Sequence, residues 1–319
     1  MFYRLIMNIP HIARFLLIFT GVFGVGSLAF ADDIGMATGQ TTGTYYAFGR
    51  DMADLAKKSD ISVTVKTSEG SFDNIKRMNS KENINLAIVQ ADVLGFFGRA
   101  KNPDSKDALA NLRVVYPLYN EEIHVLARND IKEFKDLQGK KVAIGENGSG
   151  NMLTSLNLFS MMNITPAETS KISPAQGVVA VLKGELDAAV FVGGKPVRLF
   201  KNLEDLTLPE NQKYADMLES VHFLPMDSPK MLEEYKPAEI TPSDYKFVKE
   251  KVPTIAVQSL LVGRDLSKDK NKAKCKQISV FAKAIRAGLS ALKETGHAKW
   301  KEVDLDANIG SWKKDSCVW

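Results

Sequence analysis

The chain has 319 residues, of which 45% are hydrophobic and 25% are charged, and its formal net charge is +4 at neutral pH. This length and apolar content allow a full hydrophobic core of about two domains and exclude an intrinsically disordered chain. The near balance of charge, with lysines scattered along the sequence, excludes the basic footprint of a nucleic-acid-binding protein.

Residues 1–31 have the pattern of a secretory signal peptide. Two arginines precede an uncharged run at 15–30, and small residues follow at the spacing that signal peptidase prefers, so we expect cleavage after Ala29 or Ala31. A membrane anchor is the alternative, but the run is shorter than the roughly 20 residues of a spanning helix. The remaining sequence has no apolar run of spanning length. We therefore expect a soluble mature protein in the periplasm.

The mature chain alternates short apolar strands with helices. In the first part we predict strands at 34–37, 61–66 and 86–89, and helices at 45–58, from 71 and from 91. The alternation restarts with a strand at 141–144, helices at 150–162 and 177–183, and a strand at 187–192. This order is typical of parallel, doubly wound α/β sheets.

Two long extended segments interrupt this alternation. One runs over 114–128 and is predicted to break at Pro117, and the other runs over 254–263. Two such crossovers, with a sheet restarting between them, indicate a second lobe inserted into the first. We predict lobe 1 from residues 32–127 plus 254–319, closed by a helix at 276–293, and lobe 2 from residues 128–253.

Nearly every predicted strand-to-helix turn is rich in glycine, hydroxyl and amide residues. The five turns span 39–46, 68–71, 90–92, 145–151 and 191–196. In an open α/β sheet such turns lie at the carboxyl ends of the strands, where ligands bind, and helix N-termini there attract anions. Helix capping is the simpler explanation of any one turn. Five of them at matching places in two sheets predict a clamp for a small anion.

These turns carry a family resemblance. The sequence Gly-Gln-Thr-Thr-Gly-Thr-Tyr-Tyr at 39–46, with Gly49, resembles the opening signature of the TAXI family, the substrate-binding subunits of TRAP transporters. Later blocks at 68–75, 87–92, 119–124, 148–150 and 191–194 are similar to that family in the same order. The resemblance implies a type II periplasmic-binding-protein fold, in which two doubly wound lobes are joined by two extended crossovers around a central cleft.

The same resemblance implies a small carboxylate ligand, which is an oxo-dicarboxylate, a dicarboxylate or an acidic amino acid. It implies a TRAP membrane permease as partner, with no other contact to the membrane. The implied ligand-binding residues are Thr42, Gly43, Thr44, Tyr45, Tyr46, Ser71, Asn74, Gln90, Glu121, Ser149, Gly150, Asn151, Gly193 and Gly194, to which we add Lys195 for its charge. At most one of the two tyrosines should face the ligand, because neighbouring helical residues point in different directions. Gln40 and Lys195 depart from the family pattern.

Lys195 and Glu121 are the charged side chains among the predicted ligand residues. The five turns contain no arginine, so we expect anion capture by backbone N–H groups and hydroxyls with Lys195 as an added cation, which favours a diacid. The alternative is that Lys195 points to solvent. Glu121 would repel an anion but would suit the ammonium group of an amino acid, and a solvated hinge carboxylate is the other reading.

Two cysteines, Cys275 and Cys317, lie near the C-terminus. An even number in an exported chain predicts one disulfide that holds the C-terminal tail, with two free thiols as the alternative.

Enzymatic motifs are missing from the sequence. Ser149 lacks the spacing of a G-x-S-x-G elbow, Lys195 follows an incomplete phosphate loop, and no H-E-x-x-H occurs. We expect no enzymatic activity, no cofactor and no metal. His124 is expected to be structural and Asp92 to cap a helix. A binding protein of an ATP-driven importer and a periplasmic ligand sensor remain as alternatives to a TRAP subunit.

Overall fold

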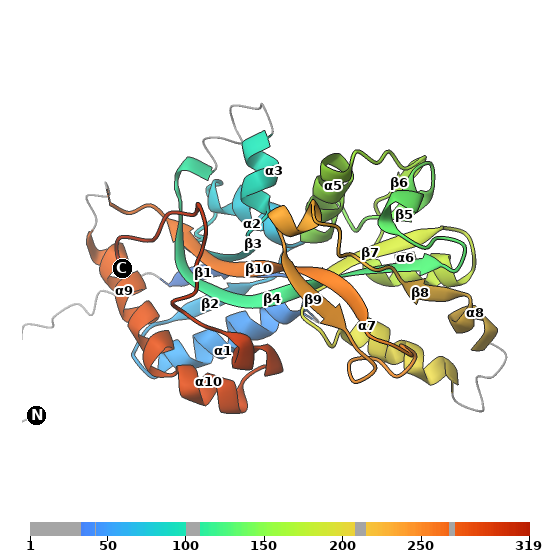
Figure 1. The fold of residues 1–319 in the computed structure, drawn as a ribbon. Helices are drawn as coiled ribbons and strands as arrows, with labels where there is room; N and C mark the ends of the chain where they lie inside the picture. The colour runs from blue at the N-terminus through green and yellow to red at the C-terminus, as the bar shows by residue number, and fades with distance from the viewer. Residues whose placement is uncertain (1–32, 42, 100–108, 208–214, 268–271) are drawn as a thin grey trace, which may run out of the picture. The chain divides into compact units, whose positions relative to one another are not determined.

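Ten strands of the described residues form a single sheet in the computed structural model (Figure 1). The structure describes residues 33–41, 43–99, 109–207, 215–267 and 272–319, so the predicted signal peptide and Thr42 lie outside it. The strands are β1 Ile34–Ala37, β2 Val63–Lys66, β3 Leu86–Gln90, β4 Leu112–Arg128, β5 Lys141–Ala143, β6 Glu168–Ser170, β7 Ala188–Gly193, β8 Val221–Phe223, β9 Lys236–Ile240 and β10 Val252–Arg264. The main path of the sheet runs β2-β1-β3-β10-β4-β7-β5-β6, while β8 pairs with β4 and β9 pairs with β10.

Helices connect most of these strands. The α-helices are α1 Thr44–Lys57, α2 Ser71–Met78, α3 Val93–Arg99, α5 Gly150–Met162, α6 Pro174–Leu182, α7 Arg198–Lys201, α8 Ala215–Glu219, α9 Lys272–Ala287 and α10 Leu289–Thr295. Short 3-10 helices are η1 Phe134–Leu137, η2 Asn202–Thr207, η4 Met231–Glu233 and η5 Ala298–Glu302. Among the described residues no helix is both long enough and apolar enough to cross a membrane.

Two sets of parallel strands make up the sheet, and two long strands join them. β1 pairs in parallel with β2 and β3, and β5 pairs in parallel with β6 and β7. β4 and β10 lie antiparallel to each other, and each also pairs with one of the parallel sets (Figure 1). The predicted alternation and the two extended crossovers are therefore confirmed, while the lobe boundaries at 127/128 and 253/254 stay a prediction.

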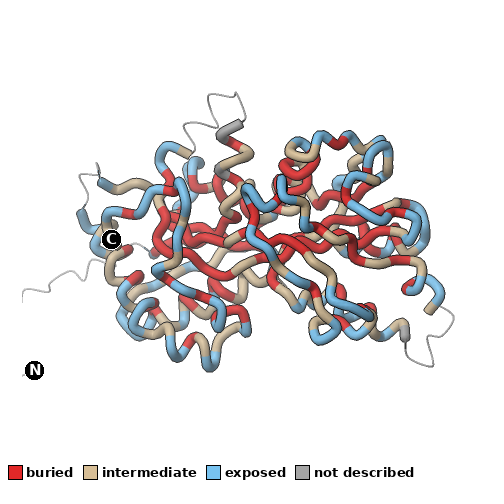
Figure 2. The backbone as a smooth tube through the Cα atoms, viewed as in Figure 1, coloured by how far each residue is buried: buried red, intermediate tan, exposed pale blue. Residues whose placement is uncertain are grey.

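The inner strands of both sets are buried along most of their length, whereas the edge strands β2 and β6 are partly exposed (Figure 2). On β3, Leu86 packs in a cluster with α1 and α9, whereas its neighbour Ala87 packs with α2 and α3. On β7, Ala188 packs with α5, whereas Ala189 packs with α6 and α7. The continuous apolar runs of these strands follow from burial on both sides.

The predicted break of the first crossover at Pro117 is wrong, because β4 is one continuous strand. Pro117 pairs with Leu260 and Asn120 pairs with Gln258, so two residues of β4 lie opposite the single residue between these partners on β10. Such a β-bulge interrupts the hydrogen bonds between β4 and β10 locally. A strand tolerates proline at a bulge, because proline has no N–H group to donate.

The predicted C-terminal helix at 276–293 is in fact two helices, α9 and α10, separated at Gly288. A Cβ at Gly288 would lie 2.4 Å from a methyl carbon of Leu55, so the backbone packs directly on α1 at this point. The short elements β6, β8, β9, α7 and α8 were not predicted, because each has five or fewer residues and too little periodicity to detect.

The C-terminal tail is fixed to the rest of the fold by a disulfide and by Trp300. Cys275 on α9 is bonded to Cys317 with a Cα–Cα distance of 5.4 Å, which confirms the predicted pairing. Trp300 stacks on Phe48 of α1 with ring centroids 4.2 Å apart, and its Nε1 donates to Asp51 Oδ2 at 2.8 Å. The tail is thus part of the core around α1.

Replacing both Cys275 and Cys317 with serine should lower the free energy of unfolding by about 2–4 kcal/mol, because the bond restricts the unfolded chain. Urea unfolding followed by circular dichroism measures this difference. Reducing agent should destabilise the wild type and leave the double variant unchanged. Two free thiols in non-reduced protein, found by mass spectrometry, would refute the pairing.

Candidate functional site

Four of the predicted ligand residues form a hydrogen-bonded series, which we call the polar row: Tyr45, Ser71, Gln90 and Glu121. The Ser71 hydroxyl donates to Gln90 Oε1 at 3.3 Å and accepts from the Gln90 N–H at 3.1 Å. The Tyr45 hydroxyl lies 3.3 Å from Ser71 Oγ, a contact in which either oxygen can donate, and it is also hydrogen-bonded to the Glu121 carboxyl. Gln90 Nε2 donates to Glu121 Oε2 at 3.2 Å. Of the two adjacent tyrosines, Tyr45 is the member of the row.

The row is assembled from α1, α2, β3 and β4. Ser71 is the first residue of α2 and Gln90 is the last residue of β3, so the row follows the carboxyl ends of strands. Asn74 supports this arrangement, because its Nδ2 donates to the carbonyls of Thr38 and Ile88, both at 2.7 Å. The Asn74 side chain thus joins the segments that follow β1 and end β3.

The N-terminus of α5 lies directly against the polar row. A Cβ at Gly150, the first residue of α5, would fall 1.9 Å from Gln90 Oε1. The Asp73 N–H donates to the Gly148 carbonyl at 3.1 Å, so the turn at 145–151 also contacts the start of α2. Turns from both predicted lobes therefore meet at Gln90, and only glycine fits at position 150 in this arrangement.

The side chains next to Gly150 bond locally. Ser149 caps α5 by accepting from the Met152 N–H at 3.1 Å, and Asn151 Oδ1 accepts from the Val192 N–H at 2.9 Å. At the first turn, the Gly43 N–H donates to the Gln40 carbonyl at 2.8 Å, and Thr44 and Tyr46 belong to the first turn of α1. These contacts shape the turns.

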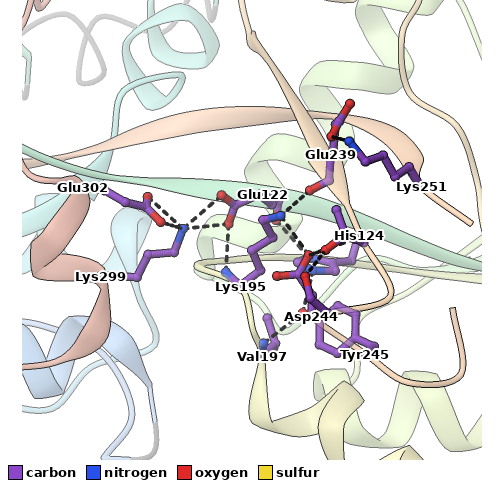
Figure 3. A network of polar contacts seen from close by, with 12 residues as sticks. Glu122, His124, Lys195, Val197, Glu239, Asp244, Tyr245, Lys251, Lys299 and Glu302 are labelled. Atoms are coloured by element: carbon purple, nitrogen blue, oxygen red, sulfur yellow. Dashed lines mark hydrogen bonds and ion pairs between the residues drawn. The ribbon is translucent and has the colours of Figure 1, made fainter.

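Lys195 belongs to a second network, around Glu122 (Figure 3). Gly193 pairs with Glu122 across the sheet, and Gly194 lies next to the Lys299 side chain. Lys195 Nζ forms an ion pair with Asp244 Oδ2 at 2.8 Å and donates to the Glu239 carbonyl. The positive charge of Lys195 is therefore already paired in the protein. The preference for a diacid ligand, which rested on an available Lys195, loses its structural argument.

Lys299, which is not among the predicted site residues, is 3% exposed and lies in η5. Its Nζ contacts Glu122 Oε1 at 2.9 Å and Glu302 Oε1 at 2.7 Å (Figure 3). Lys195 completes the surroundings of Glu122, because its N–H donates to Glu122 Oε2 at 2.8 Å. The available signal was the acidic pair at 121–122 in a buried strand, since alternate residues face opposite sides and each buried carboxylate needs a partner.

His124 is structural, in line with the expectation from its position on the extended segment. It is fully buried, with Nδ1 3.0 Å from the Glu122 carbonyl and Nε2 2.9 Å from the Tyr245 hydroxyl. A carbonyl only accepts, so Nδ1 carries the hydrogen and Nε2 accepts from Tyr245. Burial lowers the pKa of His124 to about 3, which keeps the ring neutral.

The Asp92 carboxylate, which is expected to cap α3, forms its described hydrogen bonds with other elements. Its Oδ2 accepts from the Thr154 hydroxyl at 2.7 Å and from the Tyr235 hydroxyl at 2.9 Å, and its Oδ1 is buried without a described hydrogen-bond partner. Burial raises the pKa of Asp92 to about 6. The side chain thus joins the segment after β3 to α5 across the two strand sets.

Glu121 is the most perturbed acid of the polar row. Burial raises its pKa to about 8, with part of the rise offset by Tyr45 and Gln90 and part added by Asp92 and Glu122. It is 3% exposed, and its Oε1 has no hydrogen-bond partner among the described residues. No described lysine, arginine or histidine forms an ion pair with it.

A surface pocket of about 560 Å³ is lined by residues outside the polar row. Its lining residues are Gln40, Thr41, Thr67, Ser68, Glu69, Asp73 and Arg77. Gln40 links its own turn to the turns at 68–71 and 145–151. Its Nε2 donates to Glu69 Oε2 at 3.4 Å and to Glu146 Oε2 at 3.2 Å. No group of three His, Cys, Asp or Glu residues within the described ranges could hold a metal ion.

Several solved structures cover most of this chain at low identity. BugD, a periplasmic binding protein, is 13% identical over 86% of this chain and 88% of its own, with a TM-score of 0.49. The periplasmic sulfonate-binding protein SsuA of Methylobacillus flagellatus KT is 14% identical over 83% and 72%, with a TM-score of 0.47. A histidine kinase sensor domain similar to periplasmic binding proteins is 12% identical over 86% and 98%, with a TM-score of 0.46. At these scores the likeness assigns neither a ligand nor a partner.

Strand order, crossovers and turns define the class of protein, a mixed α/β fold of the type II periplasmic-binding kind, as predicted. The sequence profile of the NMT1-like family matches residues 36–297, which is most of the chain. The chain therefore belongs to the NMT1-like family, whose members are periplasmic-binding-protein-like.

Replacing Glu121 with glutamine should flatten the pH dependence of stability. The folded protein holds the Glu121 proton up to about pH 8, whereas the unfolded chain releases it near the ordinary pKa of 4.5. The free energy of unfolding therefore falls as the pH rises between these values. Thermal melts should show Glu121→Gln gaining stability over the wild type from pH 5 to pH 8.

Glu294→Gln, which changes an exposed glutamate on α10, is the matched control and should follow the wild type. A constant difference between Glu121→Gln and the wild type over the whole range would contradict the buried, protonated state of Glu121.

Proposed function

We propose that this chain is a periplasmic solute-binding protein that captures a small carboxylate and delivers it to a membrane permease. One observation carries the proposal: turns from both predicted lobes meet at Gln90, where the polar row and the N-terminus of α5 adjoin. Ligand sites of open α/β sheets occur at this edge. Capture and release require no reaction, and the absence of enzymatic activity stays a prediction.

The carboxylate of the ligand is assigned to the N-terminus of α5 and the hydroxyls of the row. The first N–H groups of a helix lack intrahelical partners, and the helix dipole adds partial positive charge there. α5 has 13 residues, so its dipole is well developed. The Tyr45 and Ser71 hydroxyls, 3.3 Å apart, are the neutral hydroxyl groups of the row, and the Ser71 hydrogen would turn from Gln90 Oε1 to the ligand on binding.

Binding requires the turns to separate and close again. In the described arrangement Gly150 is against Gln90, and the Asp73 N–H is bonded to the Gly148 carbonyl. β4 and β10 are the two strands that continue from one strand set to the other, so we assign the hinge to them, with residues 32–127 plus 254–319 closing on residues 128–253. Hinge closure around a ligand is the usual response of such folds.

A TRAP-type permease is the proposed partner, on the basis of the TAXI-like blocks at the turns. An ATP-driven importer is equally compatible with the family and the fold, and a ligand sensor is the third possibility. The genes beside this one distinguish them: a permease gene without an ATPase supports a TRAP system, an ATPase gene supports an importer, and a histidine kinase gene supports a sensor.

A ligand should stabilise the protein from residue 32 onward against heat. A screen of mono- and dicarboxylates, oxo acids and amino acids should give at least one compound that raises the melting temperature, since ligand at 100 times Kd contributes about 2.7 kcal/mol. Gly150→Ala should weaken that ligand about tenfold or more, because the added carbon would occupy the place at the α5 N-terminus, now taken by Gln90 Oε1, where the ligand carboxylate is proposed to bind. Calorimetry measures both affinities.

Ser160→Ala, at an exposed position on the same helix, controls for a change in α5 itself and should bind like the wild type. A screen without any stabilising compound, or equal affinities for Gly150→Ala and the wild type, would count against the site.

A further inference from the structure

Glu121 and Glu122 are neighbours in β4 with nearly equal burial, at 3% and 5% exposure, but only one of them has a cation. Glu122 is bonded to Lys299 Nζ at 2.9 Å and to the Lys195 N–H at 2.8 Å. Glu121 has only neutral hydrogen-bond partners, Gln90 Nε2 and the Tyr45 hydroxyl, and its Oε1 has no partner among the described residues. A buried carboxyl without a cationic partner destabilises a protein, so its presence calls for a functional explanation.

The groups that face Glu121 are neutral or acidic. They are Tyr45 from α1, Gln90 from β3, Asp92 from the segment after β3 and Tyr119 from β4 itself, while Glu122, on the opposite side of β4, adds a negative charge nearby. Asp92 has a second buried oxygen without a described partner. Lys299 is already held between Glu122 and Glu302. The polar group that would best complete these contacts is therefore a positively charged donor.

The side-chain amide of Gln90 is a dipole with its negative end at Oε1 and its positive end at Nε2. An amino acid likewise has a negative carboxylate and a positive ammonium group. Gln90 Oε1 lies at the N-terminus of α5, where an added Cβ on Gly150 would be 1.9 Å away, and Gln90 Nε2 donates to Glu121. The negative end of this dipole thus faces the positive end of a helix, and the positive end faces a carboxyl. A carboxylate and an ammonium group are attracted to the same two places for the same reason, and more strongly.

We propose that Glu121 binds the ammonium group of the ligand, so that the site takes small zwitterions, such as amino acids, in preference to acids without a basic nitrogen. This inference rests on the proposed solute-binding function and names the ligand class of that site. Glu121 is then the residue that determines specificity between an amino acid and its oxo-acid counterpart.

Proton release distinguishes this role from the main alternative. Without ligand, burial keeps Glu121 protonated at neutral pH. When an ammonium group binds, the carboxyl gives its proton to solvent and the pair that forms is carboxylate and ammonium. The alternative is a neutral Glu121 that donates its O–H to an oxo group, which releases no proton.

Calorimetry with two matched pairs of probes tests the proposal: L-glutamate against 2-oxoglutarate, and L-alanine against pyruvate. For the wild type at pH 7 we expect an amino acid to bind more tightly than its oxo-acid counterpart. Titrations in buffers of different ionisation enthalpy should show about one proton released per amino acid bound. In Glu121→Gln the amino acid should lose tenfold or more in affinity and the proton release should vanish, whereas Glu294→Gln should match the wild type in both.

A thermal melt of Glu121→Gln at pH 7 shows that the variant is folded, and we expect it to be at least as stable as the wild type. Oxo acids that bind at least as tightly as their amino acids, with full affinity retained in Glu121→Gln, overturn this inference but leave solute binding intact. No binding of any of the four probes overturns the zwitterion inference, and the wider ligand screen then decides whether the solute-binding proposal also fails.

Discussion

The antiparallel pairing of β4 with β10 is the constraint on which the site depends. Its register places Glu121 opposite Val257 and Glu122 opposite Ala256, while Glu122 also pairs with Gly193 on β7. Because side chains alternate along a strand, a slip of one residue would exchange the two glutamates between Lys299 and the polar row. The bulges in this pair therefore matter for function, since they fix which residue of β4 faces which side.

The adjacent glutamates of β4 differ in their partners, and in the proposed site they serve stability and recognition respectively. Glu122 is satisfied by Lys299 and by the Lys195 N–H, so it ties η5 to the segment after β7. Glu121 lies among Tyr45, Gln90 and Tyr119, where no described cation lowers its pKa. Desolvation acts on both residues, and the difference in partners explains why only one is available to a ligand.

Sequence patterns predicted the elements and turns well, and they failed where distant residues decide the chemistry. Apolar runs and helical spacing locate β1, β3, α1 and α5 because their burial is recorded in local periodicity. The turn motifs likewise indicated four residues that the structure joins in one row. Lys299 was missed because its partner Glu122 is 177 residues away, and Lys195 seemed available because Asp244 is not visible from its own turn. The break predicted at Pro117 is wrong for a similar reason, because the bulge that accommodates this proline depends on the pairing with β10.

In the proposed site, the backbone attracts the carboxylate of the ligand and a side chain attracts its ammonium group. Attraction for a carboxylate comes from the N-terminus of α5, which is a property of backbone geometry and persists through changes of side chain. Attraction for an ammonium group comes from the single side chain of Glu121, whose other neighbours neither neutralise it nor replace it. A fold of this kind can therefore keep its affinity for carboxylates while one position on β4 decides whether the ligand also carries a positive charge. Glu122 cannot vary as freely, because its loss would leave Lys299 buried beside Gly194 with Glu302 as its one remaining ion-pair partner among the described residues.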